Sequence, residues 1–167
     1  GGDGSVSVLD LATLSIRDTL DVAAAAEGVV VDPRTGDRYV LDRLGGSQVH
    51  VWRADGGLET WPAGRWPFDL ALDPGSHRLV VASHYDAAIL LWDLDTGRPL
   101  PPLALGAGGG TGDTVGDLDL DPDAGIAAVA LPEAGVVAAA DVRGGRVLWT
   151  RTVEGLAAGP EAGPGHA

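Results

Sequence analysis

A chain of 167 residues without a single cysteine excludes a disulfide framework, a thiolate metal site, a covalently attached haem and a cysteine nucleophile. The net charge of −13 and the scattered positions of the 11 basic residues, all of them arginine, argue against a protein that follows the phosphates of a nucleic acid. This length favours one domain with a sizeable core.

Two short sequence patterns recur along the chain at similar intervals, and we call the equivalent positions of successive repeats a column. The first column ends in Asp-Pro, as VVVDP at Pro33, LALDP at Pro74 and LDLDP at Pro122. A second column, offset from the first, keeps the same rhythm, and its last residues are Asp10, Arg53, Asp93 and Asp141. Two columns with one period indicate a repeat protein.

Each repeat contains about four short segments rich in Val, Leu, Ile or Trp, with Gly, Pro and Asp between them, which is typical of antiparallel strands joined by hairpins. We name the strands of one repeat a to d. The sequence predicts strands c and d at 5–20, and then three complete units at about 27–64, 67–105 and 116–153, giving roughly 14 strands. In the second complete unit we expect strands at Phe68–Leu72, Leu79–Ser83, Ile89–Trp92 and Leu100–Leu105.

The predicted fold class is all-β. A four-stranded unit of about 40 residues that cannot bury both of its faces alone is typical of a β-propeller blade, with strand a nearest the centre. Closing a ring takes at least about four blades, and residues 155–167 read as a flexible Gly/Ala/Pro tail that cannot supply the missing a and b strands. We therefore expect an incomplete ring, either an open arc or part of a larger propeller, completed by remaining blades of the same protein or by a second copy.

The ends and the longest apolar run bear on targeting and on membranes. The chain begins without Met and without a charged and apolar leader, so we interpret it as a processed or truncated piece whose targeting signal lies elsewhere. The apolar run Gly125–Ala140 is interrupted by Pro132 and Glu133, which favours two short strands around a turn over a membrane span.

The stretches GSVSVLDLATLSI and GVVVDPRTGDRYVLDRL resemble the repeats of YVTN-type β-propellers, and Ile89–Thr96 resembles the end of a WD-repeat blade. Trp-Asp occurs in only one of the three complete units, and no Gly-His pair precedes the inner strands, which favours the YVTN-like group. The resemblance covers about residues 4–153. It implies a bacterial binding scaffold, periplasmic or secreted. Such propellers are also fused to cytochrome or peroxidase domains, so the alternative is a module of a larger redox protein whose haem domain lies outside this chain.

The pair Trp92-Asp93 is interpreted as structural. Trp92 shares its column with Leu9, Trp52 and Ala140, so the position accepts apolar residues and is expected to lie buried between blades. Asp93 ends its strand, where the carboxylate can accept backbone N–H groups of the following turn.

Alternating strand directions place the a–b and c–d turns at one end of the blades and the b–c and d–a loops at the other. Functional groups commonly lie on variable loops that a rigid scaffold holds. The second set of loops, at 43–46, 63–68, 83–88, 106–117 and 131–135, is therefore the expected binding surface. Its candidate binding residues are Arg43, Arg65, Trp66, His84, Tyr85 and Asp86. The alternative is that Trp66 and Tyr85 only cap adjacent blades.

Carboxylates on the inner strands raise a second hypothesis. Asp117, Asp119 and Asp121 share one side of a strand, and Asp69 shares the column of Asp117. Asp69, Asp117 and Asp119 could line an acidic channel that binds Ca²⁺ or another hard cation. The alternative is carboxylates that face water, since the spacing from Asp117 differs from that of an EF-hand.

Three other patterns do not predict a phosphate-binding loop, a metal site or a catalytic triad. The glycines from Gly106 to Gly112 lack the Lys and Ser/Thr of a phosphate-binding loop and favour a plain insertion. The histidines His50, His77, His84 and His166 show no metal-ligand spacing. Ser83, His84 and Asp86 are neighbours without a nucleophile elbow, so no catalytic triad is predicted. We expect a non-catalytic protein without a cofactor that binds a protein or a small ligand, and neither nucleic acid nor a membrane interior.

Overall fold

The computed structural model describes residues 4–22, 26–106 and 114–154, and every regular element in these ranges is a β-strand. In chain order the strands are β1 (Ser5–Asp10), β2 (Ser15–Asp21), β3 (Ala26–Val31), β4 (Arg38–Asp42), β5 (Gln48–Trp52), β6 (Leu58–Pro62), β7 (Pro67–Asp73), β8 (Arg78–Ser83), β9 (Ala88–Asp93), β10 (Arg98–Ala104), β11 (Leu118–Asp121), β12 (Ile126–Leu131), β13 (Val136–Asp141) and β14 (Arg146–Thr152). The predicted tail, residues 155–167, lies outside the described residues.

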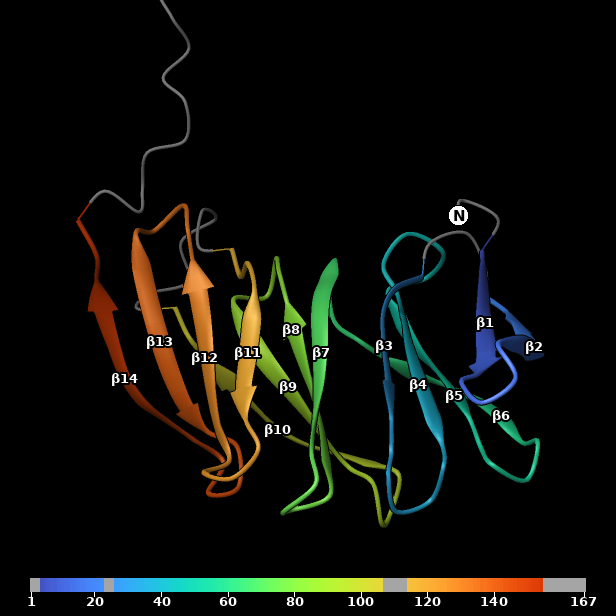
Figure 1. The fold of residues 1–167 in the computed structure, drawn as a ribbon. Coiled ribbons are helices and arrows are strands. Elements are labelled where there is room, and N and C mark those ends of the chain that lie inside the picture. Colours follow the sequence, from blue (N-terminus) through green and yellow to red (C-terminus); the bar gives the residue numbers. More distant parts are fainter. Residues whose placement is uncertain (1–3, 23–25, 107–113, 155–167) are drawn as a thin grey trace, which may run out of the picture.

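The strands form one two-stranded and three four-stranded antiparallel sheets. We call β1–β2 the half-blade, β3–β6 blade 1, β7–β10 blade 2 and β11–β14 blade 3. Within each blade, neighbours in sequence pair with each other, and β7 contacts both β3 and β11, so the first strands of the three blades lie next to one another. Figure 1 shows the sheets standing side by side in an arc that does not close within the described residues. The chain is an all-β, incomplete propeller, which confirms the predicted fold class.

The predicted strands of the second complete unit agree with β7 to β10 to within two residues at each end. The run from Gly125 also forms two strands, β12 and β13, with Pro132 in the turn between them. None of the described residues belongs to a helix that is long and apolar enough to cross a membrane.

The Asp-Pro column builds the turn that follows each inner strand. In blade 1 a carboxylate oxygen of Asp32 accepts the backbone N–H of Arg34 at 2.9 Å, and Asp121 accepts the N–H of Asp123 at the same distance. The turn ends at Gly36 in blade 1 and at Gly125 in blade 3, both with positive φ. In blade 2 the corresponding residue is His77, which adopts a φ of +51° although it is not glycine.

Trp92 lies buried in the core between blades 1 and 2, as predicted. Its ring stacks on Trp61 of blade 1, with centroids 4.6 Å apart and planes 14° from parallel. Offset stacking of this kind adds to the hydrophobic contribution of each ring. Asp93 accepts the backbone N–H of Thr96 at 2.8 Å, so the Trp-Asp pair has the structural role that the sequence indicates.

Charged pairs join blades 1, 2 and 3 at the end that carries the a–b and c–d turns. Nε2 of His77 lies 2.7 Å from Asp32 of blade 1, and its Nδ1 lies 2.7 Å from Asp95 of blade 2. At the junction of blades 2 and 3, the Arg143 guanidinium donates to both carboxylate oxygens of Asp73, at 2.8 and 2.9 Å. Because the Asp32 and Asp73 side chains are fully buried, each depends on the cation of the following blade.

Candidate functional site

The candidate site is a cluster of side chains on the b–c and d–a loops, at the end opposite the Asp-Pro turns. In Figure 1 the b–c turns lie at the upper end of the blades and the a–b turns at the lower end. The loop between β6 and β7 joins the loop between β8 and β9 through two backbone bonds: His84 N–H donates to the Trp66 carbonyl, and Tyr85 N–H to the Arg65 carbonyl. These bonds place residues about 20 positions apart side by side.

Asp86 organises the polar part of the cluster. Its carboxylate accepts the Nε–H of Arg65 at 2.6 Å, the backbone N–H of Arg65 at 2.8 Å and the hydroxyl of Ser83 at 2.6 Å. Burial alone would raise the pKa of Asp86, but the hydrogen bonds from Ser83 and Arg65 outweigh it and lower that pKa. Asp86 therefore stays ionised and fixes the loop that carries Arg65, whose guanidinium remains largely exposed.

Aromatic rings form the other part of the cluster. The Trp66 and Tyr85 centroids are 6.0 Å apart, and the Tyr85 ring meets the His84 ring edge to face at 4.7 Å. Trp66 is 37% exposed and Tyr85 is 52% exposed, so both offer aromatic surface to a ligand. Trp66 also has a φ of +57°, which is rare for a bulky residue and often marks a functional position.

Arg43, on the loop between β4 and β5, completes the set from the neighbouring blade. Its guanidinium lies over the Trp66 ring at 5.3 Å and over the Phe68 ring at 5.8 Å, and it pairs with Glu27 at 2.6 Å. All six candidate binding residues of the sequence analysis therefore meet in one cluster: Arg43, Arg65, Trp66, His84, Tyr85 and Asp86.

Three members of this cluster are not among the residues predicted from the sequence. Phe68 stacks on the His84 ring at 5.8 Å, Glu27 neutralises Arg43, and Ser83 holds Asp86. Phe68 is the only phenylalanine in the chain and stands at the start of a strand next to a candidate loop. These two features could have identified it as a member of the cluster. The pairing of Glu27 with Arg43 had no comparable signal, because it follows from the arrangement of β3 against β4.

Ser83, His84 and Asp86 make structural contacts, and the His84 ring does not lie between the other two side chains. Ser83 donates directly to Asp86, and Nδ1 of His84 faces the Val115 carbonyl at 2.5 Å. The Val115 N–H also bonds the His84 carbonyl, so His84 anchors the end of the insertion before β11. Most of the predicted glycine-rich insertion, residues 107–113, lies outside the described residues.

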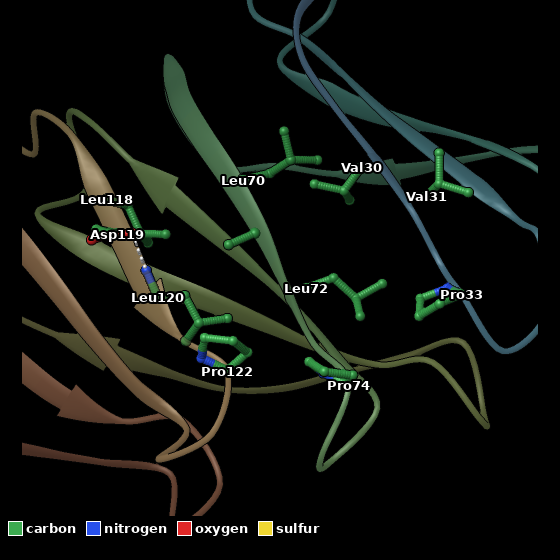
Figure 2. A pocket seen from close by; sticks show the side chains of 11 residues that line it. Val30, Val31, Pro33, Leu70, Leu72, Pro74, Leu118, Asp119, Leu120 and Pro122 are labelled. Carbon is green, nitrogen blue, oxygen red and sulfur yellow. Dashed lines mark hydrogen bonds between the residues drawn. The ribbon is translucent and has the colours of Figure 1, made fainter. Parts of the chain in front are cut away.

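The inner strands carry both the acidic residues and an apolar hollow. Burial raises the pKa of Asp69, and the nearby carboxylates of Asp117 and Asp119 raise it further. Towards the Asp-Pro turns, a hollow of about 520 Å³ lies along β3, β7 and β11, and Figure 2 shows that apolar side chains surround it. Its lining includes the three prolines of the Asp-Pro column, Pro33, Pro74 and Pro122, with Asp119 as the only carboxylate among the described lining residues.

Metal-ligand side chains do not gather here. Within the described ranges, no group of three or more His, Cys, Asp or Glu side chains could hold a metal ion. The hypothetical cation site at Asp69, Asp117 and Asp119 therefore gains no support from the geometry.

No protein-family model and no curated protein sequence matches the chain. Among solved structures, the hydrazine synthase of Kuenenia stuttgartiensis is similar to it, with a TM-score of 0.75 over 90% of this chain at 20% sequence identity. The matched region spans 43% of the hydrazine synthase chain. At this identity the likeness concerns the fold, and together with the sheet order it identifies the chain as a propeller-like all-β structure.

Proposed function

We propose that this chain is a non-catalytic propeller segment of the YVTN type that binds a protein or a small ligand through its b–c and d–a loops. The observation that carries the proposal is the cluster around Trp66 and Tyr85. It combines exposed aromatic area with an exposed guanidinium on loops that backbone bonds and Asp86 hold in place. Residues of these types dominate binding energy at protein interfaces.

The arrangement favours binding over simple capping of the blades. A ring that only sealed a blade junction would be buried, as Trp61 and Trp92 are, whereas Trp66 and Tyr85 remain accessible. Ion pairs that are already formed, such as Arg65 with Asp86, reduce the ordering that binding requires.

Photo-crosslinking tests this function. The photoreactive amino acid p-benzoylphenylalanine at position 85 should yield a discrete adduct with a partner, and Trp66→Ala should abolish the adduct. The same group at position 149, an exposed tryptophan on β14, is the matched control. Equal labelling at both positions, or none at position 85, would argue against a binding surface at the cluster.

A second candidate function is a module of a larger redox protein with a haem domain outside this chain. The likeness to a protein named hydrazine synthase supports it at the level of the fold alone. An absorption spectrum of the natural protein, isolated from its source, separates the two candidates. A haem Soret band favours the module, and its absence favours the scaffold.

A further inference from the structure

Arg78, the first residue of β8, is a partly buried cation without a carboxylate partner among the described residues. Seven of the eleven arginines form ion pairs with described carboxylates, which leaves Arg17, Arg78, Arg98 and Arg151. Arg17, Arg98 and Arg151 are exposed, whereas Arg78 is partly buried. Removing a charge from water is unfavourable unless a partner compensates for it. In a chain with a net charge of −13, such a guanidinium indicates a place for an external anion.

The hydrogen bonds that Arg78 does form use one nitrogen of its guanidinium. Nη1 donates to the backbone carbonyls of Val142 and Arg143, on the turn between β13 and β14 of blade 3. Nε and Nη2 have no acceptor among the described residues, and neither atom is fully buried. The same two nitrogens of Arg143 hold Asp73, at 2.9 and 2.8 Å. Arg78 therefore keeps open the guanidinium edge that binds a carboxylate through two parallel hydrogen bonds.

The acidic cross-strand neighbours of Arg78 have other partners. Asp93 on β9 accepts the backbone N–H and the hydroxyl of Thr96, both at 2.8 Å. Asp73 on β7 is held by Arg143 through both of its carboxylate oxygens. Both carboxylates are thus already bonded, and neither forms an ion pair with Arg78.

Arg78 lines a cavity of about 230 Å³ between blade 2 and the turn that joins β13 to β14. Figure 1 shows this turn at the lower end of blade 3. At Gly145, another lining residue, no heavy atom lies within 4 Å of the place where a Cβ would stand, so the cavity is open at this turn. Apolar side chains and a second guanidinium complete most of the wall: Leu91, Leu100, Pro101 and Arg143. Apolar walls with a few polar groups are typical of small-molecule sites.

We propose that this cavity binds a small carboxylate that carries a branched aliphatic group. The carboxylate accepts two hydrogen bonds from the Nε and Nη2 edge of Arg78, and the aliphatic group packs against Leu91, Leu100 and Pro101. The cavity is smaller than the roughly 300–1,000 Å³ of pockets that take drug-sized ligands, so the ligand is small. This site is separate from the cluster around Trp66 and Tyr85 and does not depend on the function proposed for that cluster.

Two other interpretations account for less of the geometry. A purely structural role for Arg78 explains the bonds from Nη1 that link blades 2 and 3, but it leaves the second guanidinium edge and the apolar walls unexplained. Inorganic phosphate would also accept two hydrogen bonds from that edge. The apolar side chains beside it offer no donors to the remaining phosphate oxygens, so burying them there is unfavourable.

The test titrates isovalerate (3-methylbutanoate) into the full chain at neutral pH and follows the Arg78 Nε–H and Gly145 amide signals by NMR. Isovalerate should bind at least about tenfold more tightly than 3-methylbutan-1-ol, which lacks the charge, and than acetate, which lacks the aliphatic group. Arg78→Lys keeps a cation that can donate to the blade 3 carbonyls but has no two-nitrogen edge, so it should weaken binding about tenfold. Arg17→Gln, at an exposed arginine on β2, is the matched control and should bind like the wild type.

Three results would overturn the proposal. The first is no response of either signal to isovalerate, or an equal response to the alcohol. The second is tighter binding of acetate or inorganic phosphate, which would make the cavity a general anion site. The third is wild-type affinity in a folded Arg78→Lys variant. Thermal unfolding without ligand shows whether each variant is folded, and the comparison of isovalerate with the alcohol on the wild type decides the matter if Arg78→Lys is not.

Discussion

Nε2 of His77 in blade 2 lies 2.7 Å from the buried carboxylate of Asp32 in blade 1, although 45 residues separate them in sequence. Nδ1 of the same ring lies 2.7 Å from Asp95. Only the protonated imidazole can donate from both nitrogens at once. A titratable cation therefore joins the first two blades, while a guanidinium joins the next two through Asp73 and Arg143.

This pair predicts a pH-dependent stability. Burial would lower the pKa of His77, but the hydrogen bonds to Asp32 and Asp95 outweigh it and raise that pKa above 6.5. The stabilisation is fully present below the unfolded-state value, near 6.5, and is lost as pH rises through the higher folded-state value. Urea unfolding of the wild type between pH 5 and 9 should show this alkaline loss, and His77→Gln should remove it.

Arg143→Gln provides the control for the His77 prediction. The guanidinium stays charged throughout this range, so its loss should lower stability by a similar amount at every pH between 6 and 9. An alkaline limb that persists in His77→Gln would show that another group causes it.

Trp92→Ala should lower the free energy of unfolding by about 3–5 kcal/mol, because it leaves a cavity beside Trp61 in the core between blades 1 and 2. Trp149→Ala, on the exposed outer strand of blade 3, should change it by no more than about 0.5 kcal/mol. Thermal or urea denaturation measures both. Equal effects would mean that Trp92 contributes no more to the free energy of unfolding than the exposed Trp149 does.

Gly64→Ala should disturb the candidate site as well as stability. A Cβ at this position would stand 2.2 Å from the Ser83 hydroxyl and 2.7 Å from an Asp86 carboxylate oxygen, and φ is +82°. Gly145→Ala has a similar φ of +66° but meets nothing within 4 Å, so it isolates the backbone strain of roughly 1–2 kcal/mol. Gly64→Ala should cost more than this control in urea unfolding. The same cost at both positions would mean that Ser83 and Asp86 move aside freely.

Much of the fold followed from the sequence because the Asp-Pro column marks the end of every inner strand. The hydrogen bonds of the turns at strand ends form between residues close in sequence, so the turn at Asp32 and the structural role of Asp93 could be inferred from neighbouring residues. The six candidate residues could be grouped because the alternating direction of strands places their loops at one end.

The contacts between blades could not be inferred in the same way. His77 contacts Asp32 only because the a–b turns of successive blades lie next to each other in the arc. His77 also adopts the positive φ that glycine adopts at this position in the other two blades.

The most direct test of the proposed function is a binding titration with the partner that crosslinks at position 85. Trp66→Ala and Tyr85→Ala should each weaken binding by about thirtyfold, the loss of roughly 2 kcal/mol that defines a hot spot. Trp149→Ala should bind like the wild type. Unchanged affinity in the two cluster variants, with their fold intact by circular dichroism, would contradict a binding surface at the b–c and d–a loops.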